Sequence, residues 1–362
     1  NMISMIKRMI NRFLNHLSLG NKLPDLFLFL ISVSFCSFAT GSERLELYFL
    51  SEKLLNNKIV PVQDVIQFDI KSRSLGFKGF SSGQEQNYAV ALEKGIYPIL
   101  AYSDNINGGN LSQTIQVGDF TFVGEEEANA KSGLIFGGGI FLGMKKIYDR
   151  GRYLDFNVNA SLAAAPTHEW LTIRNESINA CSRNYVKEWY FFDACANWKH
   201  NKRQFSDVIS KSLSASFTRL FRVEKTFNEG SFTLKRFMSD EYQQMQGTFA
   251  LNSLLPNGFK TNFSITAGEP VTDLISLNYS VGTTISKHVK KRPLRFSLKQ
   301  TLYDGGKFLG MGRKDITQKI SLTYPIHSRF NTSIGYTRNV SSISSFSYNG
   351  PHIEVSFPTR SF

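Results

Sequence analysis

The last two-thirds of the chain alternates apolar and polar residues, with turn residues between successive runs. The stretch from Phe259 to Ala267 reads Phe-Lys-Thr-Asn-Phe-Ser-Ile-Thr-Ala, and similar runs recur to the end of the chain. In an extended strand, this alternation places apolar residues on one face and polar residues on the other. The polar residues are mostly Ser, Thr, Asn, Lys and Arg, which suit a wet interior. Alternating runs of about ten residues separated by turns predict a transmembrane β-barrel.

Composition agrees with a barrel and argues against a helical membrane protein. The 362 residues are 41% hydrophobic and 13% aromatic, and the mean hydropathy is −0.20. Beyond residue 40 the chain contains no run of about 18 apolar residues, the length that a transmembrane helix needs. Soluble all-β sandwiches alternate in the same way, so the pattern by itself leaves both classes open.

The amino terminus favours export. Basic residues precede an apolar run from Leu26 to Phe35, and Ser37-Phe38-Ala39 then supplies small residues at the positions that a signal peptidase reads. This order predicts a signal peptide over residues 1–39, with an uncleaved anchor helix as the alternative. Its removal takes away four basic residues and one acidic residue, so the formal net charge of +13 becomes about +10. The remaining basic residues are scattered, which fits lipopolysaccharide phosphates or an anion-attracting lumen better than nucleic acid.

Two cysteines remain in the exported part, Cys181 and Cys195, fourteen residues apart. In an oxidising compartment an even number of cysteines indicates a disulfide. A hairpin centred near Glu188 would place the two side chains opposite each other, and two unpaired buried thiols are the alternative. The chain has no four-ligand spacing of Cys and His, and we expect neither a metal nor another cofactor.

The region before the barrel is short. Glu43 to Asn57 carries leucines on one face and predicts a short amphipathic helix. Two alternating stretches, Val62–Ile70 and Tyr88–Glu93, follow it. We assign residues 40–94 to an N-terminal segment that either lies in the periplasm or plugs the lumen, and residues 95–362 to the barrel.

The barrel region divides into fourteen predicted strands, and an even number is expected for a single-chain bacterial barrel. The predicted strands cover about 96–102, 131–143, 152–162, 167–180, 185–198, 209–220, 223–236, 243–254, 258–268, 273–286, 293–303, 314–325, 328–339 and 346–358.

The connections between these strands alternate in length if the first strand runs outward from the periplasm. One end then carries short turns such as Leu255–Asn257 and Pro325–His327. The other end carries longer segments, Ser103–Ala130, Asp304–Arg313 and Asn339–Ser345. Short periplasmic turns and long external loops are typical of an outer-membrane barrel, whereas a sandwich gives no reason for the asymmetry.

Alternation also assigns side chains to the two sides of the wall. The residues predicted to face lipid are Phe263, Ile265, Leu277, Tyr279, Phe296 and Leu298, and those predicted to face the lumen are Asn262, Ser264, Asn278 and Ser297. The candidate lumen charges are Lys260, Arg295, Lys299, Lys319 and Arg338. The alternative for these charges is that they are solvated wall residues without any cargo.

Short motifs at both ends of the barrel region resemble one family. The first strand ends in Tyr102-Ser103-Asp104-Asn105-Ile106-Asn107. Near the other end are Gly312-Arg313-Lys314-Asp315, Leu322-Thr323-Tyr324-Pro325, Gly335-Tyr336-Thr337-Arg338-Asn339 and Ser341-Ser342-Ile343. Over residues 95–362 the chain resembles the barrel of surface lipoprotein assembly modifier proteins, although the family has Ser-Asn-Ile where this chain has Ser-Ser-Ile. Members usually carry a helical repeat domain before the barrel, and residues 40–94 are too few for one.

The resemblance implies an outer-membrane barrel that assists the surface assembly or translocation of a lipoprotein or similar client. The polar lumen and basic bias favour an alternative, a porin-like channel with anion preference. A second alternative is an outer-membrane lipid-modifying enzyme, which would pair a serine with a histidine such as His168 or His352 at the rim. Neither histidine lies beside a nucleophile motif, so we expect no enzyme. The expected location is the bacterial outer membrane, and the expected partners are its lipid, lipopolysaccharide and a possible lipoprotein client, without nucleic acid.

Overall fold

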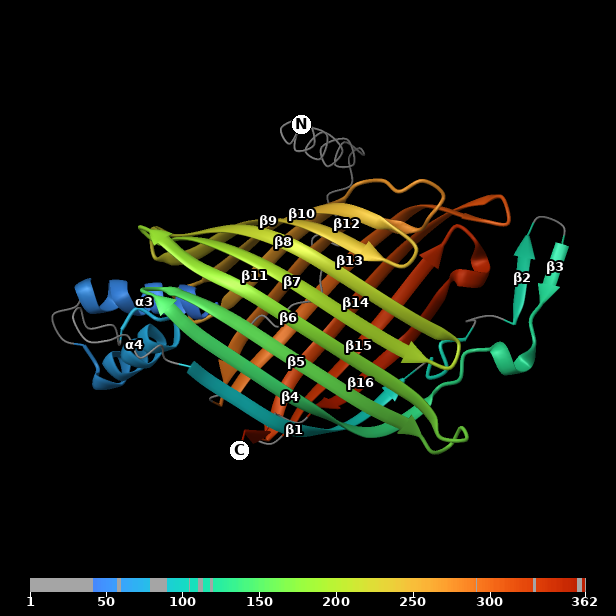
Figure 1. Ribbon diagram of the computed structural model, residues 1–362, viewed down its shortest axis with the longest axis horizontal. Helices are drawn as coiled ribbons and strands as arrows, with labels where there is room; N and C mark the ends of the chain where they lie inside the picture. The colour runs from blue at the N-terminus through green and yellow to red at the C-terminus, as the bar shows by residue number, and fades with distance from the viewer. Residues whose placement is uncertain are drawn as a thin grey trace.

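The fold is one large antiparallel sheet that curves into a barrel, with two helices at one end and a small hairpin beyond the other (Figure 1). The computed structural model describes residues 42–56, 60–78, 90–103, 105–109, 113–117, 120–290, 292–327, 330–356 and 360–361. The predicted signal peptide, residues 1–39, lies outside the described residues.

Among the residues that the structure describes, two α-helices precede the barrel, α3 (Glu43–Asn56) and α4 (Val62–Ser74). The predicted amphipathic helix corresponds to α3, but the predicted extended stretch at Val62–Ile70 is wrong, because this segment forms most of α4. Pro61 precedes its first turn, where a missing N–H costs nothing, and Asp64 and Lys71 complement the helix dipole. Among the described residues, neither helix has the length and apolar character to cross a membrane.

The strands alternate in direction through the whole sheet. Their bounds are β1 (Val90–Ser103), β2 (Thr114–Val117), β3 (Phe120–Val123), β4 (Gly133–Asp149), β5 (Arg152–Ala165), β6 (Leu171–Lys187), β7 (Tyr190–Arg203), β8 (Ser206–Val223), β9 (Thr226–Ser239), β10 (Gln243–Leu254), β11 (Lys260–Gly268), β12 (Ser276–Val289), β13 (Arg292–Phe308), β14 (Met311–His327), β15 (Phe330–Ser341), β16 (Tyr348–Ser356) and β17 (Arg360–Ser361). Strand β1 and strands β4 to β16 form the wall, and each overlaps one of the fourteen predicted strands. Strand β1 starts at Val90, five residues before the predicted boundary of the barrel.

The first wall strand, β1, pairs with other strands on both of its sides. One side of β1 pairs with β4 from Val90↔Lys146 to Ser103↔Gly133. The other side pairs with β16 from Ile99↔Ser356 to Ala101↔Glu354, and β17 adds Gly95↔Ser361 and Ile96↔Arg360. Strands β1 and β16 therefore join the beginning of the wall to its end.

The two ends of the barrel differ in their connections. The end beside α3 and α4 has tight turns at 150–151, 188–189 and 224–225. The opposite end has the segment from β1 to β4, which contains β2 and β3, and the loop 269–275. The β7–β8 and β13–β14 turns at that opposite end are equally tight, but its remaining connections are mostly longer. Short turns are expected at the periplasmic end of an outer-membrane barrel, so we assign the end beside α3 and α4 to the periplasm. The predicted loop Asp304–Arg313 is shorter than expected, because β13 and β14 extend to a turn at Leu309 and Gly310.

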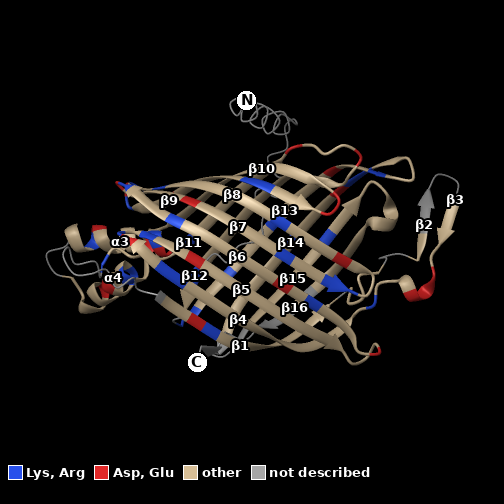
Figure 2. Cartoon of the chain, in the orientation of Figure 1, with Lys and Arg blue, Asp and Glu red and all other residues tan. Residues whose placement is uncertain are grey.

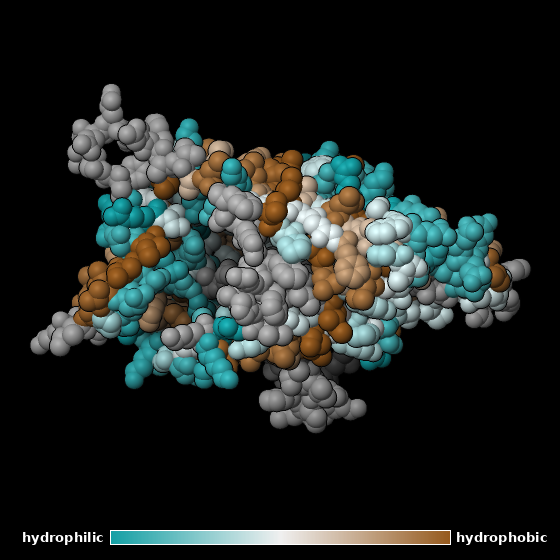
Figure 3. All heavy atoms as spheres, turned by 90° about the horizontal axis from the view of Figure 1, so that it is seen from below, coloured by the Kyte–Doolittle hydropathy of each residue, from teal (hydrophilic) through white to brown (hydrophobic). Residues whose placement is uncertain are grey.

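The outer face of the wall is apolar. One hydrogen-bonded row across five strands reads Ile285, Phe296, Leu322, Ile334 and Ile353, and every side chain in it is exposed. Figure 3 shows hydrophobic patches on the wall and hydrophilic residues toward both ends of the molecule. An exposed apolar band around an antiparallel barrel is the architecture of an outer-membrane protein, because a barrel satisfies its backbone hydrogen bonds within lipid.

One predicted lipid-facing residue lies on the other face. A bulge in β12 pairs Leu277 with Tyr303 and Tyr279 with Leu302. Since Tyr303 and Leu302 are neighbours on one strand, their partners point to opposite sides. Leu277 therefore shares the face of the lumen residues, and Asn278 is the extra residue. Tyr279 and Leu298 share the predicted outer face, where they pack with Val281.

Candidate functional site

The inner face of the barrel is polar and carries several charged side chains. The row that contains Lys260 continues through Ser286, Arg295, Thr323 and Ser333 on four further strands. The side chains of this row face inward, because Lys260 of β11 pairs with Glu46 of α3. On the same helix, Leu47 packs in a cluster with Ile147 of β4 and Tyr153 of β5. A helix that reaches from β4 to β11 lies within the curve of the sheet.

Helix α3 is held at the periplasmic mouth by a buried ion pair. The two terminal nitrogens of Arg44, Nη1 and Nη2, donate to the carboxylate oxygens of Asp193 at 2.9 and 2.8 Å. Their side chains are only 9% and 8% exposed, and the Arg44 guanidinium lies 4.1 Å from the centre of the Phe191 ring. Arg183 lies 3.4 Å from Asp193 and 3.4 Å from Asp155 on the neighbouring strands. A bidentate pair of low exposure fixes the rotation of the helix as well as its position.

A second polar contact lies two residues further along α3. The Glu46 carboxylate accepts hydrogen bonds from Lys260 of β11 and pairs with Lys71 of α4. Burial on its own would raise the pKa of Glu46, but the hydrogen bonds and charges of Lys260 and Lys71 lower this pKa below its usual value. Lys260, predicted as a free lumen charge, is therefore part of the contact between the helices and the wall.

Apolar packing completes the contact of α3 with the mouth. Leu45 lies in a buried cluster with Phe191, Leu220 and Phe227 from three neighbouring strands. The ring of Tyr48 lies 5.0 Å, centre to centre, from that of Trp189, which occupies the turn between β6 and β7. This packing and the Arg44–Asp193 pair together cover the mouth on the side of β4 to β11.

Lysines from separate strands gather on the inner face above the helix. Lys199 on β7 and Lys299 on β13 act electrostatically on Lys235 of β9. Lys299 is also the direct cross-strand partner of Lys319 on β14. Like charges at directly opposed positions destabilise a sheet by up to about 1 kcal/mol, so their presence favours a role with anions. Figure 2 shows basic residues along these strands. We call Lys199, Lys235, Lys299 and Lys319 the lumen lysines.

The five predicted lumen charges do not share one location. Arg295, Lys299 and Lys319 lie on the inner face, and Lys260 lies at the mouth. The prediction that Arg338 faces the lumen is wrong. Arg338 follows the outward residues Ile334 and Tyr336 at intervals of two, and it pairs with Gln318 on the outer face. Its position near the external end of β15 places it at the level of lipid headgroups. The sequence analysis did not name Lys199, Lys235 or Asp193. Lys199 and Asp193 lie at even intervals from Cys195 on β7, and Lys235 lies in the same row as Cys195 through Ser214 of β8, so all three face inward once that register is known.

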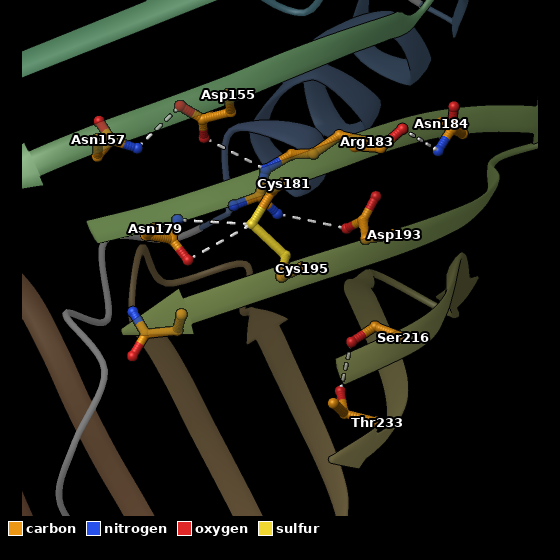
Figure 4. Close-up of a disulfide and its surroundings, with 12 residues drawn as sticks. Asp155, Asn157, Asn179, Cys181, Arg183, Asn184, Asp193, Cys195, Ser216 and Thr233 are labelled. Carbon is orange, nitrogen blue, oxygen red and sulfur yellow. Dashed lines mark hydrogen bonds and ion pairs between the residues drawn. A yellow bond between two sulfur atoms is a disulfide. The ribbon is translucent and has the colours of Figure 1, made fainter. Parts of the chain in front are cut away.

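The disulfide between Cys181 and Cys195 links β6 and β7 on the inner face. The two residues are direct partners in the ladder, with a Cα–Cα distance of 4.1 Å. Figure 4 shows the bridge beside Arg183, which lies between Asp155 and Asp193. The bridge therefore links β7, which carries Asp193, the partner of Arg44, to β6, which carries Arg183, the second cation beside Asp193.

The two histidines considered from sequence lie at separate places, His168 between β5 and β6 and His352 in β16. The Nε2 atom of His168 lies 2.8 Å from the carbonyl oxygen of Ser132, so the ring is held by backbone. His352 is the backbone partner of Gly335. In the part of the chain that the structure describes, no group of three or more His, Cys, Asp or Glu residues is arranged to hold a metal ion.

Comparison with solved structures finds other barrels of low similarity. OprB of Pseudomonas putida aligns with 75% of this chain and 94% of its own, at 7% identity and a TM-score of 0.42. OccAB3 of Acinetobacter baumannii aligns with 75% of this chain and 99% of its own, at 6% identity and a TM-score of 0.41. CdiB of Acinetobacter baumannii aligns with 91% of this chain and 73% of its own, at 10% identity and a TM-score of 0.40. No family model and no curated protein matches the sequence.

Proposed function

We propose that this protein is an outer-membrane transport barrel whose lumen favours anionic cargo and whose periplasmic mouth is covered by α3. The observation that carries the proposal is the set of lumen lysines on four strands. Rings of Lys and Arg attract anions and repel cations in aqueous pores. Asp155 and Asp193, near the mouth, are paired with Arg183 and Arg44, and Asp315, further along the inner face, is paired with Arg313.

Ion selectivity tests this proposal. The triple variant Lys235→Gln/Lys299→Gln/Lys319→Gln is expected to lower the anion-to-cation permeability ratio about threefold or more, because positive charge in the lumen concentrates anions. Reversal potentials across planar bilayers under a salt gradient measure the ratio, with and without Asp193→Asn, which weakens the docking of α3.

The matched control removes positive charge from the outer face. Lys211→Gln and Arg338→Gln take away two cations that do not face the lumen, and their permeability ratio should equal that of the unmodified protein. A cation-selective unmodified protein, or an equal shift in the control, would contradict the proposal.

A second candidate function is the surface assembly of a lipoprotein, which the family resemblance suggests. Its structural support is the location of α3 and α4 at the periplasmic mouth, where a client would arrive.

Surface labelling in cells tests the second candidate. Deletion of the gene is expected to remove most of the surface signal of at least one lipoprotein, while its total amount stays constant, because the client would remain on the periplasmic side. Protease shaving of intact cells followed by mass spectrometry measures both quantities. If every lipoprotein keeps its surface signal in the deletion strain, this candidate is wrong.

A further inference from the structure

The outer face carries a groove across its first strands that the transport proposal does not use. Its volume is about 770 Å³, and its outward-facing lining includes Ile96 and Pro98 of β1, Gly138 of β4, Leu162 of β5 and Arg174 of β6. Pro98, Gly138, Leu162 and Arg174 are successive partners in one hydrogen-bonded row. The groove therefore runs across the strands, with apolar walls along most of its length and the paired charges of Arg174 and Glu176 at one end.

The groove exists because Gly138, the middle of three successive glycines, places no side chain on the outer face of β4. Gly139 faces inward under the ring of Tyr97, and a Cβ there would lie 2.3 Å from that ring. The Tyr97 hydroxyl donates to Asn159 Oδ1 at 2.7 Å, which fixes the ring on the inner face. Gly138 faces outward, and a Cβ there would meet only the carbonyl oxygen of Tyr97, at 3.5 Å. The outer side of Gly138 is therefore open space.

The charged end of the groove continues into a chain of ion pairs on the outer face of β6 to β8. Arg174 Nη2 lies 2.5 Å from Glu176, and Glu176 lies 3.2 Å from Nδ1 of His200. Nε2 of His200 lies 2.7 Å from Asp207, which also pairs with Lys202 at 2.9 Å. The Arg174 and Lys202 side chains are 55% and 56% exposed. Each cation thus keeps surface for an additional anion.

The position of these charges along the strands matches the outer leaflet. Arg174 lies three residues from the external start of β6, and Lys202 lies one residue from the external end of β7. Trp198, whose ring lies 5.9 Å from that of His200, is four residues further in, where an aromatic belt residue is expected. Pro98, at the other end of the groove, lies in the central part of β1. The groove therefore descends from headgroup level into the apolar band.

We propose that this groove binds one acyl chain of lipid A, the phosphorylated glycolipid anchor of lipopolysaccharide, with a phosphate against Arg174 and Lys202. Three features select this occupant. The apolar walls face the hydrocarbon region, the cations lie at the level of the outer-leaflet headgroups, and guanidinium and ammonium groups both bind phosphate. Glu176 and Asp207 hold the two cations in place on the free protein.

Lipid binding by variants in the groove tests the proposal. Native mass spectrometry of the purified full chain in detergent, with added lipid A, measures the lipid-bound fraction. Gly138→Leu is expected to lower apparent affinity about fivefold or more, because the new side chain occupies the space of an acyl chain and removes its packing contacts. Ala160→Leu fills the next outward row of the same groove and should act in the same direction.

Two controls separate the groove from general effects of the substitutions. Ala215→Leu adds the same side chain to the outer face of β8, and it should leave binding unchanged. Heat-modifiable migration on gels reports whether each variant has folded. If Gly138→Leu and Ala160→Leu fold and bind lipid A as Ala215→Leu does, the groove is not the site.

Charge recognition has its own comparison. The unmodified protein should prefer lipid A to its dephosphorylated form, and Arg174→Gln/Lys202→Gln should lose this preference, while Arg338→Gln keeps it. Equal binding of both forms by the unmodified protein would overturn the assignment of the phosphate. Tighter binding of phosphatidylglycerol than of lipid A would overturn the assignment of the lipid.

Discussion

Replacement of Asp193 by asparagine is expected to release α3 from the periplasmic mouth. In the docked state of this variant, the Arg44 guanidinium would be buried without its carboxylate partner. Loss of one partner from a buried ion pair costs about 3–5 kcal/mol. A change of about 3 kcal/mol corresponds to more than a hundredfold increase in the undocked population. Hydrogen exchange of the amides of α3, measured by mass spectrometry on the protein in detergent, should therefore become much faster, and bilayer conductance should rise.

An exposed ion pair provides the control for this variant. Asp207 contacts His200 and Lys202 on the outer face with its side chain 49% exposed. Asp207→Asn should therefore change the opening free energy of α3, derived from hydrogen exchange, by less than about 1 kcal/mol. The double variant Arg44→Gln/Asp193→Asn replaces the ion pair by two amides and should regain part of the protection. Exchange in α3 that is equally slow in Asp193→Asn and Asp207→Asn would show that the Arg44–Asp193 pair does not hold the helix.

Arginine at the middle of the outer face is expected to be far more costly than arginine at the adjacent inward position. Phe249 lies near the midpoint of β10, between Phe232 and Ile265, with its side chain exposed. Phe249→Arg should destabilise the folded barrel in lipid vesicles by about 2–4 kcal/mol, because the guanidinium would enter hydrocarbon. Urea titration of folding into vesicles measures this free energy.

The neighbouring residue Ala250 supplies a matched comparison. It faces inward between Ser231 and Ser264, so Ala250→Arg keeps its charge in a polar environment and should cost less than about 1 kcal/mol. Both variants add the same side chain to the same strand at nearly the same depth. Equal losses of stability would mean that the faces of β10 are assigned incorrectly.

The local pattern of the sequence was enough to predict the strands, but not which way every side chain in them faces. Alternation over each run identified all fourteen wall strands, since period two is a property of consecutive residues. Arg338 was placed on the wrong side even though Ile334 and Tyr336 precede it at even intervals, so this error was avoidable. The wrong assignment of Leu277 to the lipid face was not avoidable, because only the pairing of β12 with β13 reveals the bulge.

The sequence by itself therefore determined the class of fold, the approximate strand positions, helix α3 and the pairing expected for Cys181 and Cys195. The tertiary structure decided that α4 is a helix, because the apolar residues of Val62–Ile70 suit either conformation until they are packed. It also decided which distant charges meet, as with Arg44 and Asp193, which are 149 residues apart. The lumen lysines and the lipid groove likewise depend on register between strands. Register is set by long-range pairing around the whole wall, and periodicity within one strand contains no record of it.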